Sequence, residues 1–142
     1  MAVLTFVLAD ERYALPLQEL REVRRMGAIT PIPGLPAAIL GAIGRHGQVL
    51  PVLDLRRLLR LGEAAPTAAS RLLVVQHQGT TAALLADQVE DIANLPSATL
   101  RPAPSRPSEG AGAFLQAIAG EGEDTVRLLD LARLLEAVRH GG

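Results

Sequence analysis

Residues 52–59 read VLDLRRLL and residues 128–135 read LLDLARLL, and the two octamers are identical at six of eight positions although 76 residues separate them. In each copy an Asp follows two apolar residues, and leucines follow the Asp at the spacing of one helix face. Self-similarity over such a distance is typical of a duplicated structural unit. The octamers therefore predict that one small fold occurs twice in this chain.

The repeat extends upstream of the octamers. Residues 13–23 (YALPLQELREV) align with residues 82–92 (AALLADQVEDI) at an offset of 69, and their apolar positions coincide. The loop that follows is longer in the second half (LPSATLRPAPSRPSEGAG, from residue 95) than in the first (ITPIPGLPAAILG, from residue 29), which accounts for the change of offset to 76. Both loops are rich in Pro, which fixes φ and favours stiff, extended passages.

Each half predicts five short strands and a helix. Residues 3–26 read as a strand, a hairpin turn at Asp10-Glu11, a second strand and a third. The second half repeats this pattern with Gln78-Gly79 at the turn, and two more strands follow the loop in each half. Asp54 and Asp130 then stand where an N-cap accepts backbone N–H bonds, so each half ends in a short helix whose leucines share one face.

Five strands closed by one helix describe a small barrel, so we predict a mainly β fold of two five-stranded barrels that share a seam. About 70 residues give only a marginal core, so the repeats are expected to pack on each other and to fold as one body. The chain is then a single domain over 1–142, and two divisions into subdomains are open. They are sequential halves, 1–66 and 67–142, or, if strands are exchanged, 15–85 and 1–14 plus 86–142.

The composition fits a globular protein and removes several classes of chemistry. With 49% apolar residues and a net charge of −1, the chain has no electrostatic bias toward nucleic acid or acidic membranes. It contains no Cys, no Lys and only three aromatic residues, which excludes thiolate chemistry, Schiff bases and aromatic base-stacking platforms. No apolar run approaches the roughly 20 residues of a membrane span. We expect a cytoplasmic protein without a cofactor.

No group of residues predicts a reaction centre, and we expect no enzyme. His46, His77 and His140 lack metal-ligand spacing, and Asp54 and Asp130 are better explained as helix caps than as a carboxylate pair. The glycines of GAIGRHG, from residue 41, indicate a hairpin more than a phosphate loop, because no Lys and no long helix follow them. Two groups of arginines are interleaved with Glu and are interpreted as solvated faces: Arg21, Arg24 and Arg25, and Arg56, Arg57 and Arg60.

Several stretches, taken in order, resemble the CheW family of bacterial chemosensory coupling proteins and the related regulatory domain of the CheA histidine kinase. They are FVLADERYALPLQELREV near the start, ITPIPGLPAAILGAI and GQVLPVLDLR in the middle, and GTTAALLADQVEDI, LRPAP and LLDLARLL in the second half. The resemblance covers nearly the whole chain. It implies two SH3-like five-stranded barrels related by a pseudo-two-fold axis, with short helices.

The resemblance implies a non-catalytic coupling function in signal transduction. Such a protein binds the cytoplasmic tip of chemoreceptors and the regulatory domain of a CheA-like histidine kinase, with no nucleic acid and no insertion into the membrane. Two alternatives stay open: a CheW-like adaptor of a pilus-motility or other non-flagellar chemosensory system, and a small-barrel nucleic-acid-binding protein. We expect the isolated chain to be a monomer.

The resemblance also implies a partner-binding groove between the barrels. A family apolar residue after the second strand falls on Leu20. We predict that the same groove is lined by Ile39, Arg45, His46, Leu85 and Val89, with Ile39 and Leu85 equally explained as core. The family carries an Arg in an Asn-Leu-Arg-Gly turn, and here the turn reads Gly44-Arg45-His46-Gly47. His46 takes the place of that Arg and lacks the five-donor fork of a guanidinium, while Arg45 stands one place earlier.

Overall fold

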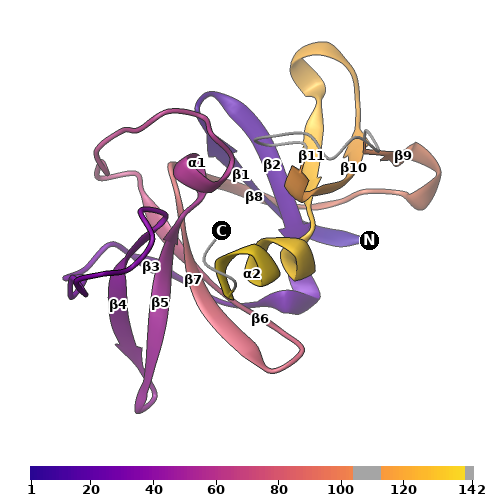
Figure 1. Ribbon diagram of the computed structural model, residues 1–142. Helices are drawn as coiled ribbons and strands as arrows, with labels where there is room; N and C mark the ends of the chain where they lie inside the picture. The colour runs from indigo at the N-terminus through magenta and orange to yellow at the C-terminus, as the bar shows by residue number, and fades with distance from the viewer. Residues whose placement is uncertain (104–112, 140–142) are drawn as a thin grey trace.

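The structure is a computed structural model that describes residues 1–103 and 113–139. Its elements follow the predicted order in each half (Figure 1). The first half forms β1 (Ala2–Leu8), β2 (Glu11–Pro16), the 3-10 turn η1 (Leu17–Glu19), β3 (Leu20–Arg25), β4 (Ile39–Arg45), β5 (Gln48–Asp54) and α1 (Leu55–Leu58). The second half forms β6 (Arg71–His77), β7 (Thr80–Ala86), β8 (Gln88–Asn94), η2 (Ser97–Thr99), β9 (Arg101–Pro102), β10 (Leu115–Ala119), η4 (Gly122–Asp124), β11 (Val126–Leu129) and α2 (Leu131–Arg139). The predicted mainly β fold is confirmed.

The strands form two sheets whose strand orders match. The first sheet runs β3-β6-β7-β5-β4, and the second runs β8-β1-β2-β11-β10-β9. Strands at equivalent positions are those that the sequence repeat aligns, and β9, with two residues, extends the second sheet beyond the match. The residue register agrees as well. Val52 lies beside Ala83 in one parallel pair, and their repeat equivalents, Leu128 and Ala14, lie beside each other in the other parallel pair. The repeat in the sequence is therefore a repeat in the structure.

Each sheet takes strands from both halves of the sequence. The first sheet joins β3, β4 and β5 of the first half to the β6–β7 hairpin of the second, and the second sheet joins β8, β10 and β11 to the β1–β2 hairpin of the first half. The two halves have thus exchanged hairpins reciprocally. The chain passes between the sheets after β2 and again after β7, and we propose subdomain boundaries at these crossings, near residues 15 and 86.

Three hairpins close through two-residue turns. Their central residues all have positive φ: Ala9 and Asp10 (49° and 66°), His46 and Gly47 (50° and 76°), and Gln78 and Gly79 (49° and 82°). Two positive φ values define the type I′ turn, whose twist matches that of the flanking strands. The first turn lies one residue earlier than predicted, because Glu11 already pairs with Leu8 at the start of β2. That register lets Phe6 stack on Tyr13, with ring centroids 6.2 Å apart.

One core is shared by the two sheets and two smaller cores fill the barrels. The shared core takes Phe6 and Leu15 from one exchanged hairpin, Leu73 and Leu84 from the other, and the buried leucines of both helices. The first barrel encloses a cluster around Val52, Leu72 and Val74, and the second encloses one around Val3, Ala14 and Leu128. Neighbouring residues of one hairpin therefore face different cores, which explains why the exchanged hairpins are apolar on both faces.

Both predicted helix caps are confirmed. The Asp54 carboxylate accepts a hydrogen bond from the Arg56 N–H at 3.1 Å, and the Asp130 carboxylate accepts one from the Arg133 N–H at 3.1 Å. A capping carboxylate satisfies a backbone donor that has no partner inside the helix. The predicted apolar face is also confirmed, since its leucines are buried in the shared core: Leu55, Leu58, Leu59, Leu131, Leu134 and Leu135.

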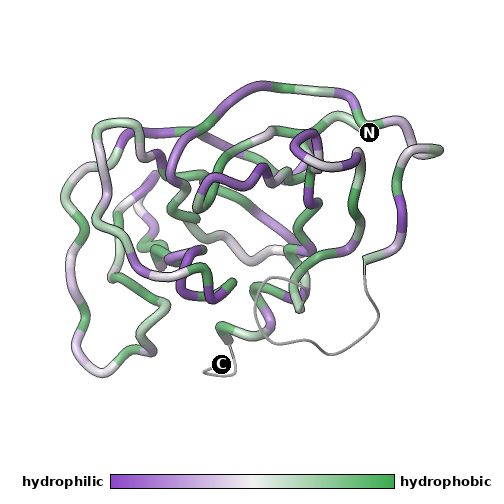
Figure 2. The backbone as a smooth tube through the Cα atoms, turned by 90° about the horizontal axis from the view of Figure 1, so that it is seen from above, coloured by the Kyte–Doolittle hydropathy of each residue, from purple (hydrophilic) through white to green (hydrophobic). Residues whose placement is uncertain are grey.

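Hydrophobic residues come in short runs throughout the chain. Figure 2 shows hydrophobic and hydrophilic stretches alternating along the backbone. Among the described residues no helix is long and apolar enough to cross a membrane.

The hairpin exchange makes a testable prediction about folding. The separate peptides 1–66 and 67–142 each lack the central hairpin of one sheet, so each alone should be unfolded, whereas an equimolar mixture should recover a cooperative thermal transition. Circular dichroism and amide-proton NMR dispersion measure this. The matched control is a 1–66 peptide carrying Leu8→Asp in the shared core, which should not restore folding. A cooperative transition in either peptide alone would contradict the prediction.

Candidate partner-binding surface

Three of the predicted site residues lie on the border of the shared core. Leu20 begins β3, Ile39 begins β4 and Val89 lies in β8, and all three are half-buried side chains packed against that core. Leu20 and Val89 occupy equivalent places in the two sheets because they are 69 residues apart in the repeat. A half-buried aliphatic side chain retains apolar surface that a partner can cover. These three residues define the candidate partner-binding surface.

The proline-rich loop before β4 fixes the position of Ile39. The N–H of Ile39 donates to the carbonyl of Pro36 at 2.9 Å, and Thr30 and Ala42 exchange two backbone hydrogen bonds of 2.9 Å. At Gly41, where φ is 151°, an added Cβ would lie 2.2 Å from the Thr30 carbonyl oxygen. Only glycine allows the loop to approach β4 so closely.

The two turn residues lie on a different part of the molecule. Arg45 ends β4, and its Nε lies 3.0 Å from a carboxylate oxygen of Glu22 in β3. Because β3 and β4 are the two edges of the first sheet, this ion pair helps to close the barrel. His46 is exposed at the hairpin turn. Its positive φ explains the residue choice in part, since His is among the residues enriched in that conformation.

Leu85 is separated from the other predicted groove residues. It is 8% exposed and belongs to the core of the first barrel, not to the shared core. Its interpretation as a core residue, which the sequence left open, matches this burial. It also borders a cavity of about 360 Å³ lined by Leu40, Asp54, Arg57, Glu63, Ala64, Ala65 and Pro66.

The charged groups at that cavity are paired with one another. Arg57 Nε lies 3.3 Å from Asp54 Oδ2, and Arg57 Nη2 lies 3.6 Å from Glu63 Oε2. Burial raises the pKa of Asp54, although hydrogen bonds from the backbone of Arg57 and Arg56 and the nearby guanidinium charges act in the opposite direction. Arg57 is paired with both Asp54 and Glu63, and Asp54 also caps α1. These structural roles explain why the three charges lie at the cavity.

Sequence reasoning missed the ion pair that joins the two barrels. Asp87 lies at the crossing between β7 and β8, and Arg56 of α1 reaches it at 2.7 Å from Nη2 to Oδ2. The same carboxylate accepts a hydrogen bond from the Ala9 N–H at 2.9 Å. Burial disfavours ionisation of Asp87, but the bonds from Arg56 and Ala9 outweigh it and lower its pKa. The side chains of Arg56 and Arg57 are 21% and 33% exposed and both form ion pairs, so this part of the predicted solvated face is partly buried.

The histidines form no metal centre among the residues described. His46 is in a turn, and His77 pairs with Glu19 of η1. His140 lies outside the described residues. Within residues 1–103 and 113–139 no cluster of three or more His, Cys, Asp or Glu side chains is placed to hold a metal ion.

Two small barrels that share one core and carry half-buried aliphatic residues at its border have the architecture of a protein-binding scaffold. The comparisons with known proteins agree. The model of the CheW-like domain family matches residues 2–139. Protein FrzA of Myxococcus xanthus is 35% identical over 135 residues, which are 94% of this chain and 84% of FrzA.

Two further relatives support the same family. A probable chemotaxis protein CheW of Rhizobium etli is 30% identical over 132 residues, 93% of this chain and 85% of that protein. The crystal structure of the scaffolding protein TtCheW from Thermoanaerobacter tengcongensis superposes with a TM-score of 0.82 at 29% identity, covering 92% of this chain and 84% of that one. This chain belongs to the CheW-like domain family, and it is a coupling, or scaffold, protein of that family.

The buried cap makes a prediction about pH. A carboxyl whose pKa is raised on folding binds its proton more tightly in the folded chain, so wild-type protein loses stability as pH rises through the range just above the usual Asp value, about 3.9. Asp54→Asn keeps the capping acceptor but cannot ionise. The free energy of unfolding of this variant, relative to wild type, should therefore improve between about pH 3 and about pH 6. Urea denaturation at each pH measures it.

The matched control for losing a cap carboxylate is Asp130→Asn, whose side chain in wild type is 25% exposed against 9% for Asp54. The role of burial at Asp54 would be contradicted if the difference in unfolding free energy between Asp54→Asn and wild type stayed constant with pH. It would also be contradicted if the variant became less stable relative to wild type as pH rises.

Proposed function

We propose that this protein couples chemoreceptors to a CheA-like histidine kinase without catalysing a reaction. One face binds the cytoplasmic tip of a receptor and another binds the regulatory domain of the kinase, so that both are held on one rigid body in the cytoplasm. The observation that carries the proposal is the half-buried aliphatic border of the shared core in a chain of the CheW-like family. Individual contacts in such an assembly are modest, about −8 kcal/mol for a micromolar contact, and gain from multivalency.

The duplication supports a function with two faces. The two barrels repeat one backbone but differ in the charges of their equivalent strands, as β3 and β8 show. Two similar but distinguishable barrels on one body suit two partners that must be held together. The candidate receptor contact combines Leu20, Ile39 and Val89, and we keep Arg45 and His46 as a second, polar contact at the turn.

A charge placed on the aliphatic border should weaken receptor binding strongly while the fold survives. We expect Leu20→Arg and Val89→Arg each to weaken binding of a receptor-tip peptide at least about tenfold, because the guanidinium must be desolvated at an apolar contact. Both positions are half-buried, so the melting temperature should change little. Isothermal titration calorimetry and thermal unfolding measure the two effects.

The matched control is Ile32→Arg, which makes the same kind of change at a side chain that is 44% exposed and outside the candidate surface. Binding should be unaffected in this variant. A large fall in melting temperature at Leu20 or Val89, with binding unchanged per folded molecule, would assign these residues to the core and remove the proposed site.

The turn makes a separate prediction. His46→Arg places a guanidinium, with five donors, at the exposed tip of the β4–β5 hairpin, where the family pattern has Arg. Affinity for an acidic receptor-tip peptide should rise about threefold to tenfold, in the range of one additional charge-assisted contact. Affinity for the kinase regulatory domain should not change. Equal affinity of wild type and variant for the receptor peptide would exclude a receptor contact at the turn.

A second question is which cellular process the signalling system of this protein controls. The similarity to FrzA keeps open a non-flagellar chemosensory output for this chain. Titration against the regulatory domains of each CheA-like kinase of the same cell tests this directly. Preference for a kinase of the flagellar system would support a flagellar output, and preference for another kinase would support a non-flagellar output.

A further inference from the structure

Two arginines face each other at one end of the first sheet. Arg25, the last residue of β3, is the cross-strand partner of Arg71, the first residue of β6. Directly opposed side chains of an antiparallel pair lie close together on one face of the sheet, so like charges there are destabilising. In the second sheet the repeat places Asn94 of β8 opposite Ala2 of β1, and neither side chain is charged. The fold therefore does not require the opposed charges.

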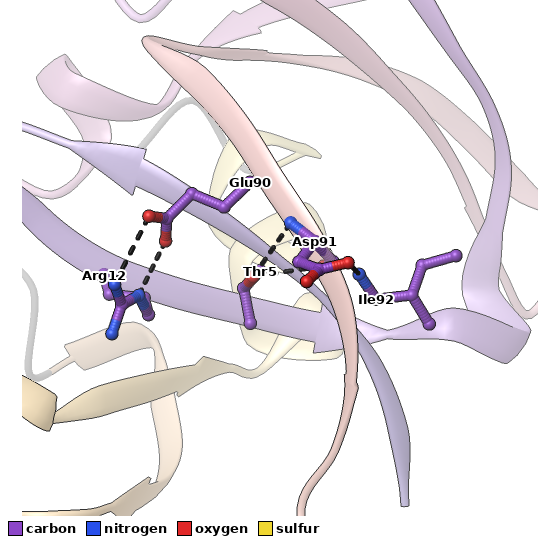
Figure 3. Close-up of polar contacts among 5 residues, drawn as sticks. All are labelled: Thr5, Arg12, Glu90, Asp91 and Ile92. Atoms are coloured by element: carbon purple, nitrogen blue, oxygen red, sulfur yellow. Dashed lines mark hydrogen bonds and ion pairs between the residues drawn. The ribbon is translucent and has the colours of Figure 1, made fainter.

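Arg25 differs from its charged neighbours because its guanidinium is unpaired. The preceding residue, Arg24, donates to the Gly44 carbonyl at 3.4 Å. On the edge of the second sheet, the Glu90 carboxylate is held by Arg12 at 2.6 and 3.3 Å (Figure 3). Arg25 is exposed and forms no hydrogen bond or ion pair with any residue in the described part of the chain. Its guanidinium is available to a ligand.

The arginine pair borders a cavity of about 420 Å³, which lies between the end of the β3–β6 pair and the loop before β6. The cavity is lined by Arg25, Met26, Thr67, Ala68, Ser70 and Arg71. Within the described ranges this lining contains two cations and no acidic side chain. The volume falls in the range of small-molecule sites.

Every polar side chain of this lining has a hydrogen to donate. The Thr67 hydroxyl accepts from the Ala69 N–H at 3.2 Å, and the Ser70 hydroxyl accepts from the Thr67 N–H at 2.9 Å. A hydroxyl that accepts one bond retains its own hydrogen for a further acceptor. Arg71 Nη1 donates to the carbonyls of Ala68 and Ser70, both at 2.8 Å. These two bonds hold the guanidinium in place and leave the hydrogens of its Nε and Nη2 for a ligand.

The chemistry of the lining selects the class of ligand. A metal ion needs oxygen or nitrogen ligands with free lone pairs, and an organic cation needs a counter-charge, whereas this site offers donors and positive charge. Arginine suits phosphate because its planar fork donates two parallel hydrogen bonds to a pair of oxygens. A phosphate group carries a charge of about −1.5 to −2 at pH 7, which matches two guanidiniums. The lining has no aromatic side chain on which a base could stack, so the recognised part of the ligand is its phosphate.

We propose that this cavity binds the phosphate group of a small molecule, either an organic phosphate or a free phosphate. Arg25 and Arg71 provide the charged contacts, and Thr67 and Ser70 provide hydroxyl donors. The ligand neutralises the two opposed charges, so its binding stabilises the folded chain. Two cations around a cavity fit a small ligand better than nucleic acid, which is bound by a longer row of cations. No residue of the candidate partner-binding surface lines the cavity, so the site does not depend on the receptor and kinase contacts proposed above.

Isothermal titration calorimetry of the full chain at low ionic strength tests the proposal, with pyrophosphate, inorganic phosphate and glycerol phosphate as probes. Pyrophosphate should bind with a Kd on the order of 0.1 mM, and saturating pyrophosphate should raise the melting temperature by about 2–6 °C. Arg25→Ala should weaken binding at least about tenfold, because it removes one charge-assisted contact. Tighter binding of glycerol phosphate than of inorganic phosphate would support an organic phosphate as the ligand, and the reverse order would support a free phosphate.

Stability without ligand distinguishes a binding role from a structural one. Ligand-free Arg25→Ala should be at least as stable as wild type, because the substitution removes one of two opposed like charges. The double variant Arg25→Asn, Arg71→Ala copies the neutral pair of the second sheet and should fold without binding pyrophosphate. The matched control is Arg24→Ala, which removes the same charge from the neighbouring residue outside the cavity. Its affinity should stay within about twofold of wild type, because a more distant exposed charge is screened.

Three results would each overturn the proposal. The first is the absence of both a binding heat and a change in melting temperature with pyrophosphate. The second is equal weakening by Arg24→Ala and Arg25→Ala, which would indicate only the general charge of the edge. The third is binding of a phosphoserine peptide by a chain that binds none of the three small probes, which would assign the arginines to a protein contact.

Discussion

The reciprocal exchange of hairpins is the constraint on which the rest of this structure depends. β1–β2 supplies the centre of the second sheet and β6–β7 the centre of the first, so neither repeat completes a sheet with its own residues. Each exchanged hairpin is covered on one face by its barrel and on the other by the core that both sheets share. A barrel of about 70 residues has little core of its own, and the shared cluster adds the apolar burial that it lacks. The two barrels are therefore one folding unit.

Duplication followed by divergence explains why this scaffold has two distinguishable faces. The backbone repeats closely, down to matching bulges at Arg21 and Glu90 and matching caps at Asp54 and Asp130. The side chains that reach solvent at equivalent places differ in charge, as β3 and β8 show. Buried positions are held by packing, in which a change of volume is felt at once, whereas exposed positions are free to change. The common fold is thus preserved while each face acquires its own chemistry.

Much of this architecture could be predicted because local patterns determine it. The octamers at residues 52 and 128, the apolar alternation and the caps identify the elements and their order. The sequence left open whether strands are exchanged, because the third strands of the two repeats carry nearly the same apolar pattern and do not specify which of them pairs with β6. The contact between Arg56 and Asp87 was missed for the same reason: the residues are 31 apart and meet only because the chain crosses between sheets beside α1. Of the proposed groove, Leu20, Ile39 and Val89 come together at one core, but Leu85 separates from them because β7 is buried on both faces and turns that side chain into the first barrel.

The edge strands show how a small scaffold obtains several contacts from few residues. Leu20 at the start of β3 packs inward on the shared core, while Val23 of the same strand is exposed on the outside. Val89 and Ile92 divide β8 in the same way. One strand therefore presents one residue to the candidate partner-binding surface and another to the open edge, with a bulge between them that fixes the charge at the boundary. Because both residues stand on a strand held by the same shared core, a partner bound at one surface is positioned rigidly with respect to whatever is bound at the other. Such fixed geometry suits a scaffold protein, because its surfaces keep set positions relative to one another.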